Sequence, residues 1–176
     1  MIILFNKPFN VLCQFTDKEG RKTLTDYIPI KNVYAAGRLD FDSEGLVILT
    51  DDGKLQNLIS DPKHKLEKTY RVQVEGLPNE ESLNKLRKEI LLKDGLTKPA
   101  KAKLISGLII QERNPSIRVR NNIPTSWIEL KISEGKNRQV RRMTAAVGHP
   151  TLRLIRYSIG DWTIENLNPG NYIIIE

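Results

Sequence analysis

Residues 35–54 read AAGRLDFDSEGLVILTDDGK, and this stretch is the centre from which the rest of the chain can be interpreted. Its first half places Arg38 and Asp40 on either side of a leucine, and its second half holds the apolar run LVIL at residues 46–49. Four apolar residues bounded by glycine and polar residues are typical of a short buried strand. Loops held by rigid strands often carry catalytic groups. The stretch is therefore either a plain turn before a strand or a loop that presents a carboxylate for chemistry.

The length and composition of the chain limit its class. With 176 residues, we expect a single domain over residues 1–176 that can bury a sizeable core. Hydrophobic residues at 39% and charged residues at 28% are ordinary for a soluble globular protein. The 28 Lys and Arg residues exceed the 21 Asp and Glu residues, which gives a net charge of +7. A polyanion such as nucleic acid is therefore the expected partner.

Several classes of protein are disfavoured by what the sequence lacks. The single cysteine, Cys13, cannot form an internal disulfide, and with two histidines the chain has no zinc-binding cluster. No segment approaches the roughly 20 apolar residues that span a bilayer, and the first residues do not resemble a signal peptide. The glycine motifs that bind nucleotide phosphates are absent. We therefore expect a protein of the reducing cytoplasm that uses no metal and no cofactor.

The periodicity of the sequence indicates an α+β fold. Residues 68–75, KTYRVQVE, and residues 127–132, WIELKI, alternate between apolar and polar residues as half-buried strands do. Further strands are expected at residues 2–5, 11–15, 151–157 and 171–176. Helices are expected at residues 54–60, 78–90 and 138–147. These elements predict a mixed, mostly antiparallel sheet flanked by helices.

Positive charge is concentrated in the last third of the chain. Between residues 136 and 156 there is no acidic residue, and the basic residues there are Lys136, Arg138, Arg141, Arg142, Arg153 and Arg156. A solvated helix face would explain such a run. The forked guanidinium of arginine also suits phosphate groups, and the neighbouring Asn137 and Gln139 could reach bases or riboses. We favour polyanion binding.

Three segments of the chain carry a family resemblance. GRLDFDSEGLVILTDDG at residues 37–53, KTYRVQVEG at 68–76 and EGKNRQVRRMTAAVGHPTLRLIRYSIGD at 134–161 resemble, in the same order, three motifs of the pseudouridine synthases of the small-subunit and large-subunit ribosomal type. The segments ILFNKP, GRKTL and IPTSW make the large-subunit members the nearer likeness. The resemblance implies the pseudouridine synthase catalytic fold. Many members carry an N-terminal S4-type RNA-binding domain, whereas this chain starts at the catalytic domain, so we expect target selection to rest on that domain's own surface.

The resemblance also implies roles for individual residues. Asp40 would be the nucleophile, and Arg141 would be the cation that keeps it ionised, with Arg138 as a second candidate for that cation. Tyr70 would stack on the target base, and Leu154 would pack against the same base. Without the resemblance, Tyr70 and Leu154 read as an ordinary strand tyrosine and an ordinary core leucine.

The reaction and the substrate follow from the same resemblance. A uridine in large-subunit (23S) ribosomal RNA would be isomerised to pseudouridine without a cofactor, by breaking the bond from N1 to C1′ and rejoining the base through C5. A base inside folded RNA must first be flipped out of its stack. The expected contacts to the RNA backbone are Lys136, Arg138, Arg142, Arg153 and Arg156. Arg38 is expected either toward RNA or in a structural pair, and we expect the protein to be a monomer.

Two other functions compete with this interpretation. A non-catalytic RNA-binding or ribosome-assembly protein would use the same basic residues, but it would have no use for Asp40, Tyr70 and Arg141 together. A hydrolase would use Asp40 with Asp42 or Glu44 as an acid–base pair.

Overall fold

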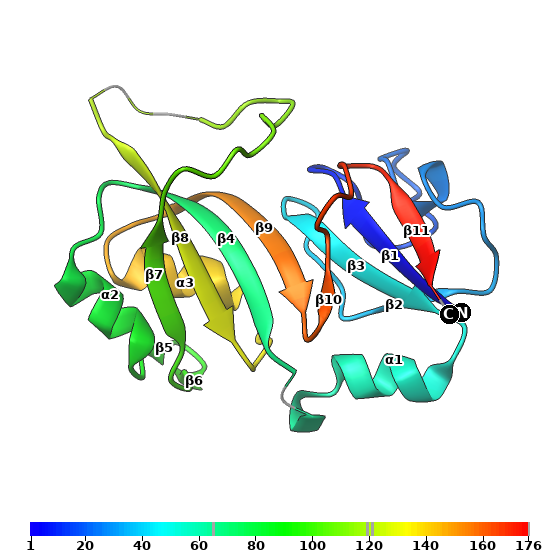
Figure 1. The fold of residues 1–176 in the computed structure, drawn as a ribbon, viewed down its shortest axis with the longest axis horizontal. Helices are drawn as coiled ribbons and strands as arrows, with labels where there is room; N and C mark the ends of the chain where they lie inside the picture. The colour runs from blue at the N-terminus through cyan, green and yellow to red at the C-terminus, as the bar shows by residue number, and fades with distance from the viewer. Residues whose placement is uncertain (65, 119, 121, 176) are drawn as a thin grey trace. The chain divides into compact units, whose positions relative to one another are not determined.

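The computed structural model describes residues 1–64, 66–118, 120 and 122–175, and the chain divides into two compact units. Unit 1 comprises Met1–Leu66 and Ile155–Glu176, and unit 2 comprises Glu67–Leu154. Each unit has its own strands and helices (Figure 1). Each also has its own buried clusters of hydrophobic side chains. The single domain expected over residues 1–176 stays a prediction.

Unit 1 is built on a sheet around the first strand of the chain. Its strands are β1 (Ile2–Lys7), β2 (Tyr34–Ala36), β3 (Glu44–Thr50), β10 (Trp162–Thr163), β11 (Tyr172–Ile175) and the end of β9 (Thr151–Ile159). Strand β1 pairs antiparallel with β11 and with β3, and β2 pairs antiparallel with β3. Strand β9 runs parallel to the start of β3, where Arg156 is opposite Gly45, and β10 turns back along β9. The apolar run after Asp40 therefore lies inside the sheet, as predicted.

The central strands β1 and β3 are buried on both faces of this sheet, since successive side chains of a strand point to opposite faces. Ile3 and Phe5 of β1 belong to one core cluster, which the segment between β1 and β2 covers through residues such as Leu24. Leu4 belongs to the other cluster, which includes Ile59 of helix α1 (Gly53–Ser60). The carboxylate of Asp52 caps this helix by accepting hydrogen bonds from the first backbone amides.

The strand expected at residues 11–15 is absent, which corrects that prediction. The segment makes only an isolated bridge between Leu12 and Thr23, and the short 3₁₀ turn η1 (Leu24–Asp26) follows it. The side chains of Val11 and Cys13 are buried. The alternation of apolar residues thus reflects side chains that pack onto the sheet, and the segment does not form a hydrogen-bonded ladder with a neighbouring strand. The carbonyl of Val11 accepts a hydrogen bond from the Lys7 ammonium instead of from a neighbouring strand.

Unit 2 is an antiparallel sheet with two helices. Its elements are β4 (Lys68–Glu75), α2 (Glu80–Arg87), β5 (Leu91–Leu92), β6 (Gly95–Leu96), β7 (Lys101–Ile105), β8 (Thr125–Ile132), α3 (Gln139–Ala146) and the start of β9. Strand β8 lies between β4 and β7 and pairs antiparallel with both, and β5 and β6 form a separate small hairpin. The helices α2 and α3 contribute Leu83, Leu86, Val140 and Met143 to the same core cluster as the inward residues of β4 and β8.

The predicted α+β class is confirmed, with a mixed sheet and three α-helices among the described residues. Strand β4 has the bounds that the alternation in KTYRVQVE predicted. Helix α3 ends before Gly148, as expected. The terminal strand expected at residues 171–176 is β11, and its expected last residue, Glu176, lies outside the described part of the chain.

Candidate active site

Asp40 lies in unit 1 on a short loop, residues 37–43, which we call the Asp40 loop. It connects β2 to β3, and the Asp40 carbonyl accepts a hydrogen bond of 3.1 Å from the Ser43 amide, which closes a tight turn. Leu39 is buried in the core and anchors the loop, while Asp40 is half-buried. The loop enters its turn through Gly37, which has φ = 72°, a value that favours glycine. A partly accessible carboxylate is thus held between two strands.

Lys7 lies beneath the Asp40 loop, and it is a residue that the sequence analysis missed. Its side chain is 0% exposed. The ammonium donates hydrogen bonds of 2.9 Å to the carbonyls of Pro8 and Val11 and of 3.3 Å to the carbonyl of Phe41, the residue after Asp40. All three bonds go to backbone oxygens, which satisfies a buried cation without a salt bridge. The signal in the sequence was a lysine at the end of the apolar strand IILFNK.

Burial and nearby acids shift the pKa of Lys7 in opposite directions. Burial lowers the pKa of the ammonium from its ordinary value of 10.5 to about 8. Attraction to Cys13, Glu44, Asp42 and Asp40, in that order, opposes the lowering. The three acids at residues 40, 42 and 44 therefore share one buried cation in unit 1.

Arg156 holds the other end of the Asp40 loop. Its side chain is 4% exposed, and its Nε donates a hydrogen bond of 3.0 Å to the carbonyl of Leu46 in β3. Its Nη2 donates one of 2.6 Å to the carbonyl of Gly37, where the loop begins. Arg156 was expected to contact the RNA backbone, and that role stays a prediction. The structure instead places its guanidinium on two backbone carbonyls.

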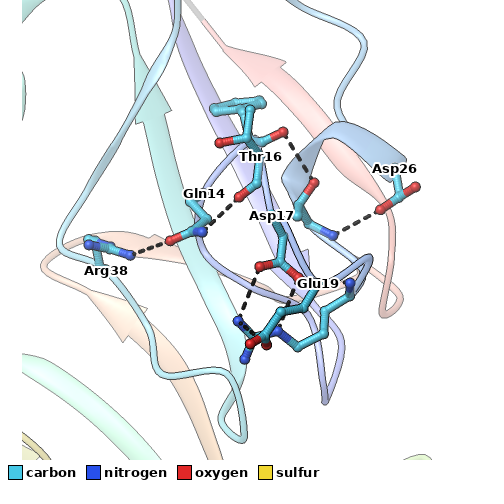
Figure 2. Close-up of polar contacts among 9 residues, drawn as sticks. Gln14, Thr16, Asp17, Glu19, Asp26 and Arg38 are labelled. Atoms are coloured by element: carbon cyan, nitrogen blue, oxygen red, sulfur yellow. Dashed lines mark hydrogen bonds and ion pairs between the residues drawn. The ribbon is translucent and has the colours of Figure 1, made fainter.

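Arg38 extends to the surface of unit 1. Figure 2 shows its guanidinium beside Gln14, and Nη2 donates a hydrogen bond of 3.2 Å to Oε1 of Gln14. In the same region Arg21 donates hydrogen bonds to both carboxylate oxygens of Asp17. These bonds lower the pKa of Asp17 to about 2. Arg38 therefore has a partner within unit 1, and its expected role, toward RNA or in a structural pair, stays a prediction.

In unit 2, Tyr70 and Leu154 lie in the same buried cluster. Both side chains are less than a tenth exposed, and the cluster also contains Val140 and Met143 of helix α3. Arg141 follows Val140 on that helix and is half-buried. The structure thus brings the strand tyrosine, the β9 leucine and the arginine-bearing helix together. The packing of Tyr70 and Leu154 also fits the alternative interpretation of both as core residues.

A basic hollow opens at the start of helix α3. It is a shallow depression of about 440 Å³, lined by Lys93, Asp94, Asn137, Arg138, Arg141, Arg142 and Ala145. Four of these residues are cationic and one is acidic. The volume lies in the range of small-ligand sites. Lys93 was not among the residues singled out from the sequence, because it comes from the β5–β6 hairpin and not from the basic run.

Arg138 and Arg142 are held differently at this hollow. Arg142 makes a forked pair with Asp94, with bonds of 2.7 and 3.1 Å from its two terminal nitrogens. The pair lowers the pKa of Asp94 and raises that of Arg142. Arg138 is exposed and adopts the left-handed conformation, with φ = 52°, at the N-cap of α3. Backbone conformations of this kind are uncommon for residues other than glycine and often occur at functional sites.

A buried polar pair fixes the turn that leads into α3. Gln139 donates a hydrogen bond of 2.8 Å to Glu134, whose carboxylate also accepts one of 2.7 Å from the Lys98 amide. The amide of Lys136 donates to Oε1 of Gln139 at 3.1 Å. This network orients the segment from which Arg138 and Arg141 project, and the sequence analysis did not find it.

Lys136 and Arg153, two further predicted RNA contacts, already have partners within unit 2. The ammonium of Lys136 donates a hydrogen bond of 3.4 Å to the carbonyl of Leu96. Arg153 is buried, and its guanidinium lies 5.9 Å from the centre of the Trp127 ring. Their roles toward RNA stay predictions.

Residues 1–64, 66–118, 120 and 122–175 contain neither a metal-binding cluster of side chains nor a helix suited to a membrane. In those ranges, no three His, Cys, Asp or Glu side chains gather so that they could hold a metal ion. None of the helices in the same ranges has the length and apolar character needed to cross a bilayer.

Comparison with known proteins gives consistent matches over almost the whole chain. The model of the RNA pseudouridylate synthase family matches residues 1–146. Ribosomal large subunit pseudouridine synthase E of Vibrio parahaemolyticus is 61% identical over 97% of this chain and 72% of its own length. The protein of the same name from Xanthomonas axonopodis pv. citri is 52% identical over 96% of this chain and 90% of its own length. A crystal structure of pseudouridylate synthase is 32% identical, with a TM-score of 0.80 over 99% of this chain and 70% of that one.

Proposed function

Because this chain belongs to the RNA pseudouridylate synthase family, we propose that it isomerises a specific uridine of large-subunit (23S) ribosomal RNA to pseudouridine. The observation that carries the substrate is the 61% identity to a relative named as a large-subunit enzyme, since that likeness extends over 97% of this chain. The reaction needs neither an oxidant nor an energy source. We place it in the cytoplasm and expect a monomer to carry it out.

Asp40 is the proposed nucleophile. A carboxylate can attack the uridine and later leave again, which divides one difficult step into two easier ones. The bond from N1 to C1′ breaks, the base turns, and a bond forms between C5 and C1′. The proton of C5 passes to solvent, and N1 gains one, so the atoms balance. The position of Asp40 supports this role, because the residue is half-buried on a short loop between two strands.

The other proposed catalytic residues belong to unit 2. Arg141 is proposed as the cation that keeps the carboxylate of Asp40 ionised, and Tyr70 as the residue that stacks on the base. Leu154 is proposed to pack against the base. The common cluster of Tyr70, Leu154 and the core residues of α3 supports joint action within that unit. The assignment to Asp40 itself rests on the family resemblance.

The basic hollow is proposed to bind phosphates of the RNA next to the target uridine. Arg138 and Arg142 were expected to contact the RNA backbone, and both line the hollow. Lys93 joins them from the β5–β6 hairpin. Lysine and arginine at this density neutralise phosphates, and the binding constant should therefore fall steeply with added salt. Lys136, Arg153 and Arg38 remain proposed contacts with weaker support, since each has a partner within the protein.

The proposal is tested by release of tritium from ribosomal RNA labelled at uridine C5. The wild-type protein should release label from large-subunit RNA, and sequencing of the product should find one new pseudouridine. Asp40→Asn should abolish release and keep RNA binding. Asp42→Asn is the matched control in the same loop, and it should keep most of the activity.

Three outcomes would contradict the proposal. Full activity of Asp40→Asn would remove Asp40 from the mechanism. RNA binding without any release by the wild-type protein would favour the non-catalytic RNA-binding alternative. Free uracil or ribose as a product, with both aspartates required, would favour the hydrolase.

A further inference from the structure

Arg156 is a buried arginine whose two bonded nitrogens join different parts of unit 1. Nε donates to Leu46 of β3 at 3.0 Å, and Nη2 donates to Gly37 of the Asp40 loop at 2.6 Å. Both acceptors are backbone carbonyls, and they lie 110 and 119 positions from Arg156 in the sequence. One side chain at 4% exposure thus ties the loop to a strand in the middle of the sheet.

We propose that Arg156 is a positioning residue, whose guanidinium fixes the Gly37 end of the Asp40 loop to strand β3 and thereby sets the place of the Asp40 carboxylate. The proposal rests on Asp40 being the nucleophile. It differs from the expectation that Arg156 contacts RNA, because a side chain this deeply buried, with its fork directed at two carbonyls, presents little surface to a phosphate.

The bonds of Arg156 suit this role physically. Hydrogen bonds from a charged donor are roughly twice as strong as those between neutral groups. The guanidinium is planar and rigid, so the directions of its two bonds are fixed relative to each other. Gly37 stands three residues before Asp40, which leaves little chain over which a displacement could be absorbed. An error of about 1 Å in the position of a reacting group can cost about a hundredfold in rate.

The backbone of Arg156 is held as firmly as its side chain. Arg156 is opposite Gly45 in the parallel pairing of β9 with β3. A Cβ at Gly45 would lie 2.3 Å from the Arg156 carbonyl oxygen, so the two backbones approach more closely than any side chain would allow. The guanidinium therefore projects from a fixed point on β9, next to the start of β3, the strand that follows the Asp40 loop.

Lys7 completes the arrangement at the far end of the loop. Its ammonium bonds the carbonyl of Phe41 at 3.3 Å, directly after Asp40. Arg156 bonds the carbonyl of Gly37 before Asp40. The nucleophile is thus bracketed by two buried cations, and only residues 38–40 lie between the two bonded carbonyls.

The test compares Arg156→Met and Arg156→Lys with the wild-type protein in single-turnover tritium release. Arg156→Met should lower kcat about a hundredfold, the cost of a misplaced reacting group, with KM for RNA unchanged. Arg156→Lys keeps the charge, but its single ammonium cannot reproduce both hydrogen bonds to the carbonyls. Its kcat should therefore lie between those of the wild-type protein and Arg156→Met. Arg120→Met removes an exposed arginine of unit 2 that bonds Glu75, and it should leave both constants at their wild-type values.

Hydrogen exchange gives a readout that does not depend on activity. In both Arg156 variants, the amides of residues 37–43 should exchange about tenfold faster or more, which is the effect of losing one charge-assisted hydrogen bond. The amides of β1 should keep their wild-type protection. If Arg156→Met does not fold, Arg156→Lys alone decides by the same two measurements.

Two results would overturn the positioning role. One is an unchanged kcat and unchanged loop exchange in Arg156→Lys. The other is a raised KM at unchanged kcat, which would make Arg156 an RNA contact. An inactive wild-type protein would instead refute the proposed function, and the exchange measurement would still report on the loop.

Discussion

Raising the pH through 8 should deprotonate the ammonium of Lys7 while the protein stays folded. The pKa of Lys7 is about 8 in the folded protein, against its ordinary 10.5 in an unfolded chain. Between these two values the unfolded chain binds more protons than the folded one, so the free energy of unfolding rises with pH in this window. The difference in pKa corresponds to about 3 kcal/mol from this one group. This stability is present above pH 10.5 and is lost as the pH falls through about 8.

Activity should change in the opposite direction over the same window. A neutral amine still donates hydrogen bonds, but it no longer offsets the charges of Asp40, Asp42 and Glu44, which attract the ammonium at present. We expect kcat to fall with an apparent pKa near 8. A loss of activity accompanied by a gain in stability distinguishes a local titration from alkaline unfolding.

The assay is single-turnover tritium release at saturating RNA, from about pH 6.5 to 9.5, beside urea unfolding in the same buffers. Lys7→Met keeps the length of the side chain but has no group that titrates. Its rate should be lower than that of wild type at every pH, and the rate should not fall with an apparent pKa near 8. Its stability reflects opposing effects, because three buried carbonyls lose their donor at about 1–3 kcal/mol each, while burial of the charge, about 3 kcal/mol, is relieved.

If the rate of Lys7→Met still falls with an apparent pKa near 8, another group is titrating, and the assignment of this pKa to Lys7 is refuted. A wild-type protein that loses stability between pH 8 and 9.5 would refute the linkage argument, because the lowered pKa requires the reverse sign.

Two further predictions concern the basic hollow and the close approach of β9 to β3. Lys93→Met and Arg138→Met should each reduce, by about one, the steepness with which the logarithm of the RNA-binding constant falls with the logarithm of the salt concentration. Arg21→Met should not change this slope. If filter-binding titrations give the Lys93 and Arg138 variants the wild-type slope, phosphate contacts at the hollow are excluded. Gly45→Ala should destabilise unit 1 by at least about 1–3 kcal/mol in urea, because its Cβ would meet the Arg156 backbone at 2.3 Å and its φ is 112°. Gly53→Ala, at an open position of helix α1, should be neutral or slightly stabilising, and equal effects of the two changes would contradict the close-packing argument.

Local pattern was sufficient to predict most of the elements. The alternation in KTYRVQVE gave the bounds of β4, because a half-buried strand requires that period. Helix α3 was predicted to stop at Gly148, and it does. The segment at residues 11–15 was predicted wrongly for a physical reason. Alternating apolar residues fit any extended chain that packs on a core, and the difference from a strand lies in which donors its carbonyls meet.

The site was less predictable, because its contacts join distant parts of the chain. Lys7 reaches Phe41 across 34 positions, and Arg156 reaches Gly37 across 119. No local pattern distinguishes an arginine that will bond carbonyls from one that will bind phosphate. The basic run at residues 136–156 was therefore read as one surface, whereas Arg153 and Arg156 are buried and Arg138 is exposed.

The buried cations of unit 1 also offset the charges of three acids within five residues, Asp40 and Asp42 of the Asp40 loop and Glu44 at the start of β3. Three negative charges this close together repel one another. Lys7 attracts all three, and Arg156 adds a second positive charge at the start of the same loop. These two cations bond the backbone on either side of Asp40, at the carbonyls of Phe41 and Gly37. Positive charge bonded to the neighbouring backbone acts on the carboxylate of Asp40 and also fixes both ends of the segment that carries it, so the same two side chains can set both the charge and the position of the proposed nucleophile.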